Sequence, residues 1–187
     1  MPFPSWILER DDWMIDVMFL LDDELRLVDC NPAWERFAVE NGGLRLSRAE
    51  VCGRLILDFV PDVLRTFYLH KYWLAKRTAD GTYFDYDCST PDRIRLFRMT
   101  MLPLEDLLLI TNRQRLDEKC QARPPLTVEE SSHYISSTGF VVMCANCRKT
   151  RHRESEMHWD WIPEMLSHDR FKVSHGLCPR CKTHLYG

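Results

Sequence analysis

Two C-x2-C pairs place the strongest constraint on what this chain can fold into. Cys144 and Cys147 form the first pair and Cys178 and Cys181 the second, with 30 residues between the pairs. A C-x2-C turn holds two sulfurs at the separation that a tetrahedral metal ion requires, and it frees backbone N–H groups to donate to the sulfurs. The four cysteines are therefore predicted to bind one zinc ion per chain in a small C-terminal module.

Disulfides and iron are the other interpretations of the same thiols. Eight cysteines could indicate a secreted disulfide framework, but no basic start followed by an apolar run marks a secretory signal. We therefore expect a cytoplasmic protein with reduced thiols, in which the paired spacing indicates metal ligation. A single iron ion or an iron–sulfur cluster stays open as the occupant, because four thiolates also bind these.

His175 lies three residues before Cys178 and could compete as a ligand. We expect it instead to hydrogen-bond a cysteine sulfur or a backbone carbonyl, since four thiolates already complete a closed structural site. A closed site leaves no position for a reactive water, so a hydrolytic metal centre is not expected. Phosphate-loop, nucleophile-elbow, H-E-x-x-H and kinase motifs are missing from the sequence, and we expect no enzymatic activity.

Upstream of residue 113 the apolar pattern alternates between strand-like and helix-like stretches. Two short strands, at residues 17–21 and 25–30, are followed by Asn31 and Pro32, which favour the start of a helix over residues 32–40. A longer helix is expected to follow Asp62. Three further strands are expected at residues 82–88, 94–102 and 107–111.

This order, with the segment NPAWERFAVENG directly after the second strand, resembles the PAS sensory domain family. The matching residues are Asn31, Trp34 and Phe37 of the first helix, the later Gly53, and the strands around residues 89–92 and 97–99. The resemblance implies an α+β fold, in which a five-stranded antiparallel sheet and short helices enclose a cavity. It also implies an unknown small-molecule ligand in that cavity.

Four segments are predicted along the chain. Residues 1–15 form an N-terminal helical segment, 16–116 the PAS-like domain, 117–142 a linker with Pro124 and Pro125, and 143–187 a zinc-ribbon-like module. The last segment resembles ribbon-like tails of some bacterial PAS and response-regulator proteins. The N-terminal segment is amphipathic, so it either packs on its own domain or pairs two chains, and we expect a homodimer.

His70 is the candidate cofactor ligand in the PAS-like region, because some PAS relatives hold haem through a histidine on the long helix. Val63, Phe67 and Leu74 share its predicted face and are apolar, so His70 is expected to point inward. The alternative, which we favour, is a core histidine that is bonded to a backbone carbonyl or a buried water.

Charge and hydropathy limit the partners of the chain. The net charge of −3 gives no electrostatic reason to expect nucleic acid, and the apolar stretches are too short to span a membrane. We expect a bacterial-type signalling or regulatory protein, in which a PAS sensor or docking domain is coupled to a zinc module that contacts a partner protein. One of the indoles of Trp159 and Trp161 is expected to anchor that contact. The alternatives are a nucleic-acid-binding transcriptional regulator acting through the zinc module, and a redox sensor based on thiolates or iron.

Overall fold

The computed structural model describes residues 3–43, 45–119, 126–166 and 171–186. The chain divides into two compact units, which we call the sheet unit (Met1–Asp85 and Arg98–Gln114) and the cysteine unit (Tyr86–Phe97 and Arg115–Gly187). The two prolines of the predicted linker, Pro124 and Pro125, lie outside the described residues. Among the helices that the structure describes, none combines the length and the apolar character that crossing a membrane requires.

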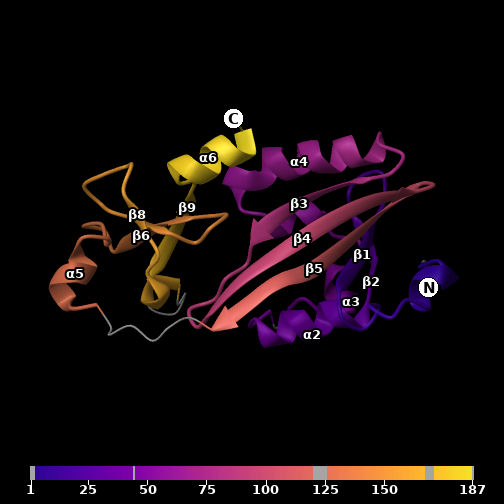
Figure 1. Ribbon diagram of the computed structural model, residues 1–187, viewed down its shortest axis with the longest axis horizontal. Coiled ribbons are helices and arrows are strands. Elements are labelled where there is room, and N and C mark those ends of the chain that lie inside the picture. Colours follow the sequence, from indigo (N-terminus) through magenta and orange to yellow (C-terminus); the bar gives the residue numbers. More distant parts are fainter. Residues whose placement is uncertain (1–2, 44, 120–125, 167–170, 187) are drawn as a thin grey trace. The chain divides into compact units, whose positions relative to one another are not determined.

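A five-stranded sheet organises the first half of the chain (Figure 1). Its strands follow the order β2-β1-β5-β4-β3, and β1 pairs antiparallel with both β2 and β5. The strands are β1 (Val17–Leu21), β2 (Leu27–Cys30), β3 (Thr82–Asp87), β4 (Arg93–Leu104) and β5 (Leu107–Lys119). Apart from the short N-terminal helix, the helices of this region lie between β2 and β3 in sequence, so the predicted PAS-like α+β fold class is confirmed.

Asn31 fixes the junction between the sheet and the first of these helices, α2 (Pro32–Glu40). Its side-chain oxygen accepts hydrogen bonds from the backbone N–H groups of Met18 (2.9 Å) and Trp34 (3.2 Å). Its amide nitrogen donates to the carbonyl of Asp16 (2.8 Å). The side chain is fully buried, so each of these bonds satisfies a polar group that would otherwise be costly to bury.

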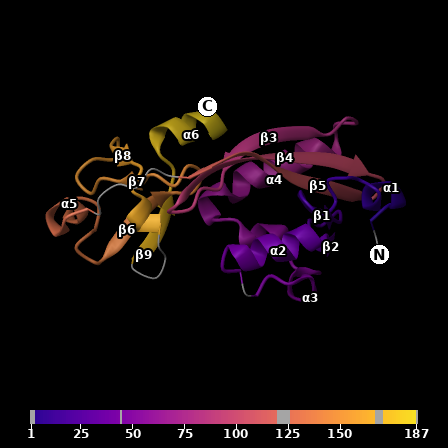
Figure 2. The ribbon, with the colours of Figure 1, turned by 60° about the horizontal axis from the view of Figure 1, so that its bottom comes forward.

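The short helices that follow α2 lead to one long helix. They are α3 (Arg48–Val51), η1 (Ile56–Phe59) and α4 (Asp62–Lys76). Figure 2 shows α2 and α3 close to β1 and β2, where α2 packs on β1 and α3 on β2. Helix α4 packs against β3 through Phe67 and Phe84, whose ring centroids lie 5.2 Å apart. On β4, Phe97, Met99 and Met101 alternate with more exposed residues, as a strand with one buried face requires.

Three expectations from the sequence are wrong. The N-terminal helix, α1, covers only Ser5–Leu8, and the chain then forms turns up to β1. Strand β5 does not end at residue 111 but continues to Lys119, through exposed charged residues that a hydrophobic pattern does not reveal. His70 is exposed, because the buried residues of α4 are Leu64, Phe67, Tyr72 and Ala75, a face rotated away from His70.

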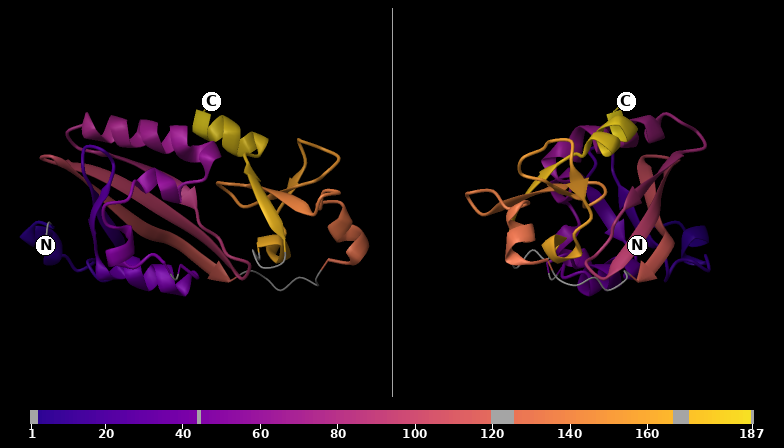
Figure 3. Two further views of the ribbon diagram at one scale, coloured as in Figure 1. Left: turned by 180° about the vertical axis from the view of Figure 1, so that it is seen from behind. Right: turned by 60° about the vertical axis from the view of Figure 1, so that its left-hand side comes forward.

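The cysteine unit contains a four-stranded sheet in the order β8-β7-β6-β9, in which β6 and β9 are parallel and the other pairs antiparallel. Val141, Ile162 and Met165 are buried together beside this sheet. Figure 3 shows β9 running directly into the last helix, α6. The elements are α5 (Val128–Ser132), β6 (Phe140–Cys144), β7 (Thr150–Arg151), β8 (Trp159–Asp160), η2 (Pro163–Leu166), β9 (Lys172–Gly176) and α6 (Pro179–Tyr186).

Candidate metal centre

The parallel pair β6 and β9 brings the two cysteine pairs to one edge of the small sheet. Cys144 is the last residue of β6 and lies opposite Gly176, the last residue of β9. Cys178 follows two residues later, and Cys181 lies in the first turn of α6. Because the ends of parallel strands meet at the same edge, segments 30 residues apart in sequence supply ligands to one point.

A tight turn after β6 positions Cys147. Its backbone bonds run from the Cys144 N–H to the Lys149 carbonyl (2.8 Å) and from the Arg148 N–H to the Cys144 carbonyl (3.0 Å). Arg148 adopts a left-handed backbone conformation with φ 61°, which a non-glycine residue rarely does. The turn reverses the chain from β6 into β7 and directs both sulfurs of the first pair to the same side.

The four sulfurs form a compact cluster, as predicted. All lie within 4.8 Å of one another, and the Cys147 and Cys178 sulfurs are 3.7 Å apart. A tetrahedron with metal–sulfur bonds of about 2.3 Å has edges of about 3.8 Å, so this spacing fits a single tetrahedral ion. Three of the four cysteines are buried, and Cys147 is half-buried. The cluster could therefore hold a metal ion in a closed site.

Hydrogen bonds to the sulfurs favour negative charge in the cluster. The backbone N–H of Cys178 donates to the Cys144 sulfur, and the Asn146 amide donates to the Cys181 sulfur, each at 3.4 Å. Hydrogen bonds from the thiols of Cys147 and Cys181 hold the pKa of Cys144 well below its ordinary value and raise the pKa of each donor, so without a cation the negative charge resides on Cys144. Thiolates are the form of cysteine that binds metals, so these donors prepare the site for a cation.

Trp159 and Leu177 cover the cluster. Both pack against the cysteines, and the Trp159 indole N–H donates to the Glu156 carbonyl at 2.7 Å. Trp159 and Trp161 are both half-buried, so each indole remains partly exposed. His175 lies on β9 with an exposed side chain, outside the group of converging sulfurs. His70 lies in the sheet unit, and the inward orientation on which its predicted role rested is not found.

A groove of about 370 Å³ lies beside this cover. Met157 is 75% exposed at its wall, whereas Trp159 and Leu177 extend from the groove to the cysteines. The lining contains two basic residues, Arg151 and Lys182, and one acidic residue, Glu156. The complete lining is Arg151, Glu156, Met157, Trp159, Leu177, Pro179, Lys182 and Thr183.

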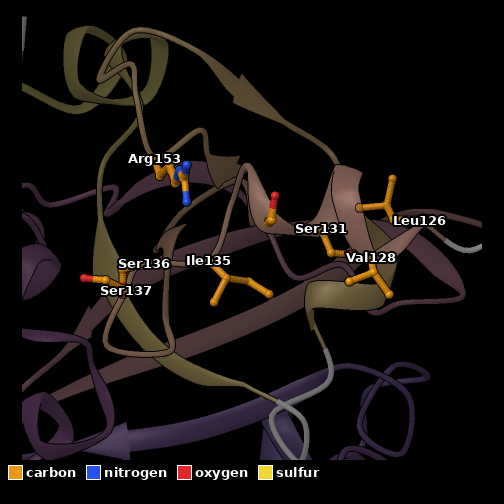
Figure 4. A pocket seen from close by; sticks show the side chains of 8 residues that line it. Leu126, Val128, Ser131, Ile135, Ser136, Ser137 and Arg153 are labelled. Carbon is orange, nitrogen blue, oxygen red and sulfur yellow. The ribbon is translucent and has the colours of Figure 1, made fainter.

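A second pocket, of about 380 Å³, is lined by residues of the cysteine unit between positions 126 and 153 (Figure 4). Apolar side chains and serine hydroxyls line it, and Arg153 is its charged residue. The lining consists of Leu126, Val128, Ser131, Ser132, Ile135, Ser136, Ser137 and Arg153. In Figure 4, Arg153 lies apart from Leu126 and Val128, with Ile135 between them.

Sequence reasoning missed a stack of three histidines in this unit. The rings of His133, His152 and His158 lie face to face, with His152 in the middle. The three residues follow no regular spacing in the sequence. Their charged neighbours are typical of histidines exposed to solvent. Only the pairing of β7 with β8, which no local pattern announces, brings His152 and His158 together.

Comparison with known proteins finds similar solved structures. No family model matches the sequence, and no curated protein is significantly similar to it. One similar solved structure is a PAS domain from a two-component sensor histidine kinase, with TM-score 0.38, 23% identity, and 54% of this chain and 85% of that chain covered. Another is a domain of an HTR-like protein from Haloarcula marismortui ATCC 43049, with TM-score 0.37, 12% identity, and 54% and 98% covered. The fold class itself rests on the strand order described above.

Proposed function

We infer that this protein is a non-catalytic signalling or regulatory protein, in which a PAS-like sensor unit is coupled to a zinc module that contacts a partner protein. One zinc ion per chain is the proposed occupant of the cysteine cluster, because zinc prefers four tetrahedral thiolates in closed structural sites. Such a site supplies folding energy rather than chemistry. The proposed role of the metal is therefore to hold a binding surface in shape.

The groove beside the cysteine cluster is the observation that carries this proposal. Met157 exposes an apolar side chain at the groove, and Trp159 connects the groove to the cysteines. Exposed apolar residues with a polar and charged rim are typical of protein contact sites. Because Trp159 packs on the cluster, a change in the metal loops would reach the groove directly.

The proposed input is a small molecule or a protein that binds the sheet unit. A ligand that binds one conformation of this unit more tightly shifts the population toward that conformation. Strands β3, β4 and β5 each contribute residues to both units, so they are continuous elements through which such a shift could travel. The proposed pathway rests on the strands that the two units share, and it names no particular ligand.

Met157→Asp tests the proposed partner surface. Zinc-loaded wild-type protein and this variant are used to capture partners from cell extract, and captured proteins are quantified by mass spectrometry. Met157→Asp is expected to lose the partner while it keeps its zinc, because the substituted side chain contacts solvent and not the cysteines. Val39→Asp is the matched control, since Val39 is 68% exposed and lies on α2 in the sheet unit.

Three outcomes contradict the proposal. Equal capture by the wild-type protein and Met157→Asp would show that the groove is not the contact surface. Salt-sensitive retention of DNA by the wild-type protein, reduced by Lys182→Gln, would favour the nucleic-acid-binding alternative. A visible charge-transfer absorption of the purified protein would replace zinc by iron and favour the redox alternative.

A further inference from the structure

The three stacked histidines join segments that are distant in sequence. The ring of His152 lies 5.3 Å from that of His133, with 17° between the planes, and 5.4 Å from that of His158, with 12° between the planes. His133 follows α5, His152 follows β7, and His158 precedes β8. Two backbone bonds accompany the stack: Arg153 N–H donates to the His133 carbonyl (2.7 Å) and His152 N–H to the His158 carbonyl (2.9 Å). The stack thus connects α5 to the hairpin of β7 and β8.

The middle ring is neutral in this arrangement. The backbone N–H of Glu154 donates to Nδ1 of His152 at 3.3 Å. A ring nitrogen that accepts a hydrogen bond carries no proton, and a histidine with one unprotonated nitrogen has no charge. A proton on this Nδ1 would place two N–H groups against each other, so protonation of His152 breaks the bond to Glu154.

The outer ring of His158, in contrast, can accommodate a proton. Its Nε2 lies 3.0 Å from Oδ2 of Asp160, which also accepts a hydrogen bond from the Tyr134 hydroxyl at 2.7 Å. A carboxylate at this distance stabilises an imidazolium. Burial and the bond to Asp160 raise the pKa of Tyr134 to about 12, so this hydroxyl keeps its proton throughout the range in which histidines titrate.

The remaining charged groups around the stack are mostly paired with one another. Arg153 lies 3.2 Å from Glu154, and Arg151 lies 3.8 Å from Glu156. Glu130 of α5, which is close to His133, accepts hydrogen bonds from Thr127 at the start of the helix. Asp160 is therefore the carboxylate bonded to the stack, and it contacts only the outer ring of His158.

The arrangement suits protons better than a metal ion. Parallel rings lie side by side, so their nitrogens do not converge on one point. Among the residues that the structure describes, the four cysteines are the group whose ligand atoms converge as a metal site requires. Asp160 lies beside the ring of His158 and Glu130 close to His133, so a proton on the middle ring of His152 adds a positive charge between two rings that a carboxylate already favours in the charged form.

We propose that the histidine stack is a proton sensor, which holds α5 against the hairpin of β7 and β8 at neutral pH and releases it in mild acid. The first proton goes to His158 beside Asp160 and leaves the stack closed. A further proton, taken up in mild acid by His152 or His133, places a second positive charge in the stack. In the closed stack, His152 must be neutral to accept the hydrogen bond from Glu154. In the open stack, it is free to bind a proton, so protonation shifts the equilibrium toward the open state.

Opening would alter the pocket of Figure 4. Arg153 lines this pocket, and its backbone N–H is bonded to His133. Ser131 and Ser132, directly before His133, line the same pocket. Separation of His133 from His152 therefore moves Arg153 away from the serines, and the shape of the pocket becomes dependent on pH.

His152→Asn tests the sensor, because the asparagine side chain offers an acceptor to Glu154 N–H but takes up no proton. Amide hydrogen exchange of the full-length, metal-loaded protein is measured by NMR at about pH 7.5 and about pH 5.5 and corrected for intrinsic rates. In the wild-type protein we expect the protection of the residue 152 and 153 amides to fall by roughly tenfold in acid. His152→Asn should keep its protection. His184→Asn, at an exposed histidine of α6, should behave as the wild type.

Unchanged protection of the wild-type amides in acid would overturn the proposal. So would an equal loss of protection in the wild type and in His152→Asn, because acid would then act through other groups, including the metal ligands. Should His152→Asn not fold at neutral pH, His152→Phe keeps an aromatic ring in the stack without a titratable nitrogen, and the same comparison applies.

Discussion

The sheet unit and the cysteine unit differ in what fills their interiors. In the sheet unit, aliphatic side chains such as Met18, Leu20 and Ile110 are completely buried. In the cysteine unit, a small apolar cluster around Val141 is accompanied by a separate cluster of buried cysteines. Apolar burial contributes about 25 cal/mol per Å² without any cofactor, whereas crowded thiolates repel one another until a cation joins them. We therefore expect the two units to respond to different perturbations.

Metal removal should separate the two units most strongly. Cys178→Ser, or a strong chelator, is expected to unfold the cysteine unit and leave the sheet unit folded, because binding energy in such a small site is folding energy. Hydrogen exchange would show loss of protection in β6 and β9 and retention in β1 and β5. Cys52→Ser, at a half-buried thiol of the sheet unit, is the matched control and should keep its metal.

Thiol reactivity gives a second measure of the same separation. Burial raises the pKa of Cys30 in the sheet unit to about 12, so at about pH 8 this thiol should stay unreactive after chelation. The four thiols of the metal centre should become reactive together. Reaction of Cys30 at the same rate as Cys144 would mean that the sheet unit unfolds with the cysteine unit. Protein that carries no metal after gentle purification would contradict the metal centre itself.

Gly81→Ala should act on the sheet unit alone. Gly81 has φ +70°, and an added Cβ would overlap the backbone carbonyl of Met101 on β4. Strain in the left-handed region together with this overlap should cost about 3–5 kcal/mol of the free energy of unfolding of the sheet unit. Gly53→Ala is the control, because Gly53 has φ +84° with open space around it, and should cost about 1 kcal/mol. Chemical denaturation of both variants, followed in the sheet unit, gives the comparison. Equal costs would show that β4 yields to the added methyl group.

Local signals predicted the sheet unit well where one residue makes several bonds. Asn31 and Pro32 predict the start of helix α2, and the structure gives that helix the predicted bounds, Pro32–Glu40. The inward face of α4 is harder to predict from sequence, because Leu64 and Phe67 are buried while apolar Leu69 and Trp73 are about half exposed. Apolar residues on two faces of one helix give two possible inward faces, and only packing against β3 selects between them. His70 was placed on the wrong one.

The metal centre shows the same division between local and non-local information. The spacing within each C-x2-C pair is local, and it led directly to Cys144, Cys147, Cys178 and Cys181. That the pairs meet depends on the parallel pairing of β6 with β9, which no pattern within either strand encodes. The histidine stack depends equally on strand pairing. Sequence therefore reveals ligands that come in spaced pairs and misses sites that are assembled one residue at a time from different strands.

Arg148→Gly should give the smallest effect and refine the comparison furthest. Arg148 and Glu105 are non-glycine residues with left-handed backbone conformations, φ 61° and 47°, one in each unit. Glycine removes the strain of this conformation but adds freedom to the unfolded chain, so each substitution should stabilise its own unit by about 0.5–1 kcal/mol. Arg148→Gly should therefore slow the release of metal to a competing chelator by roughly twofold to fivefold. Glu105→Gly should leave that rate unchanged and raise the stability of the sheet unit. If Glu105→Gly slows metal release as much as Arg148→Gly does, the two units unfold as one, and the contrast between their interiors has no consequence for stability.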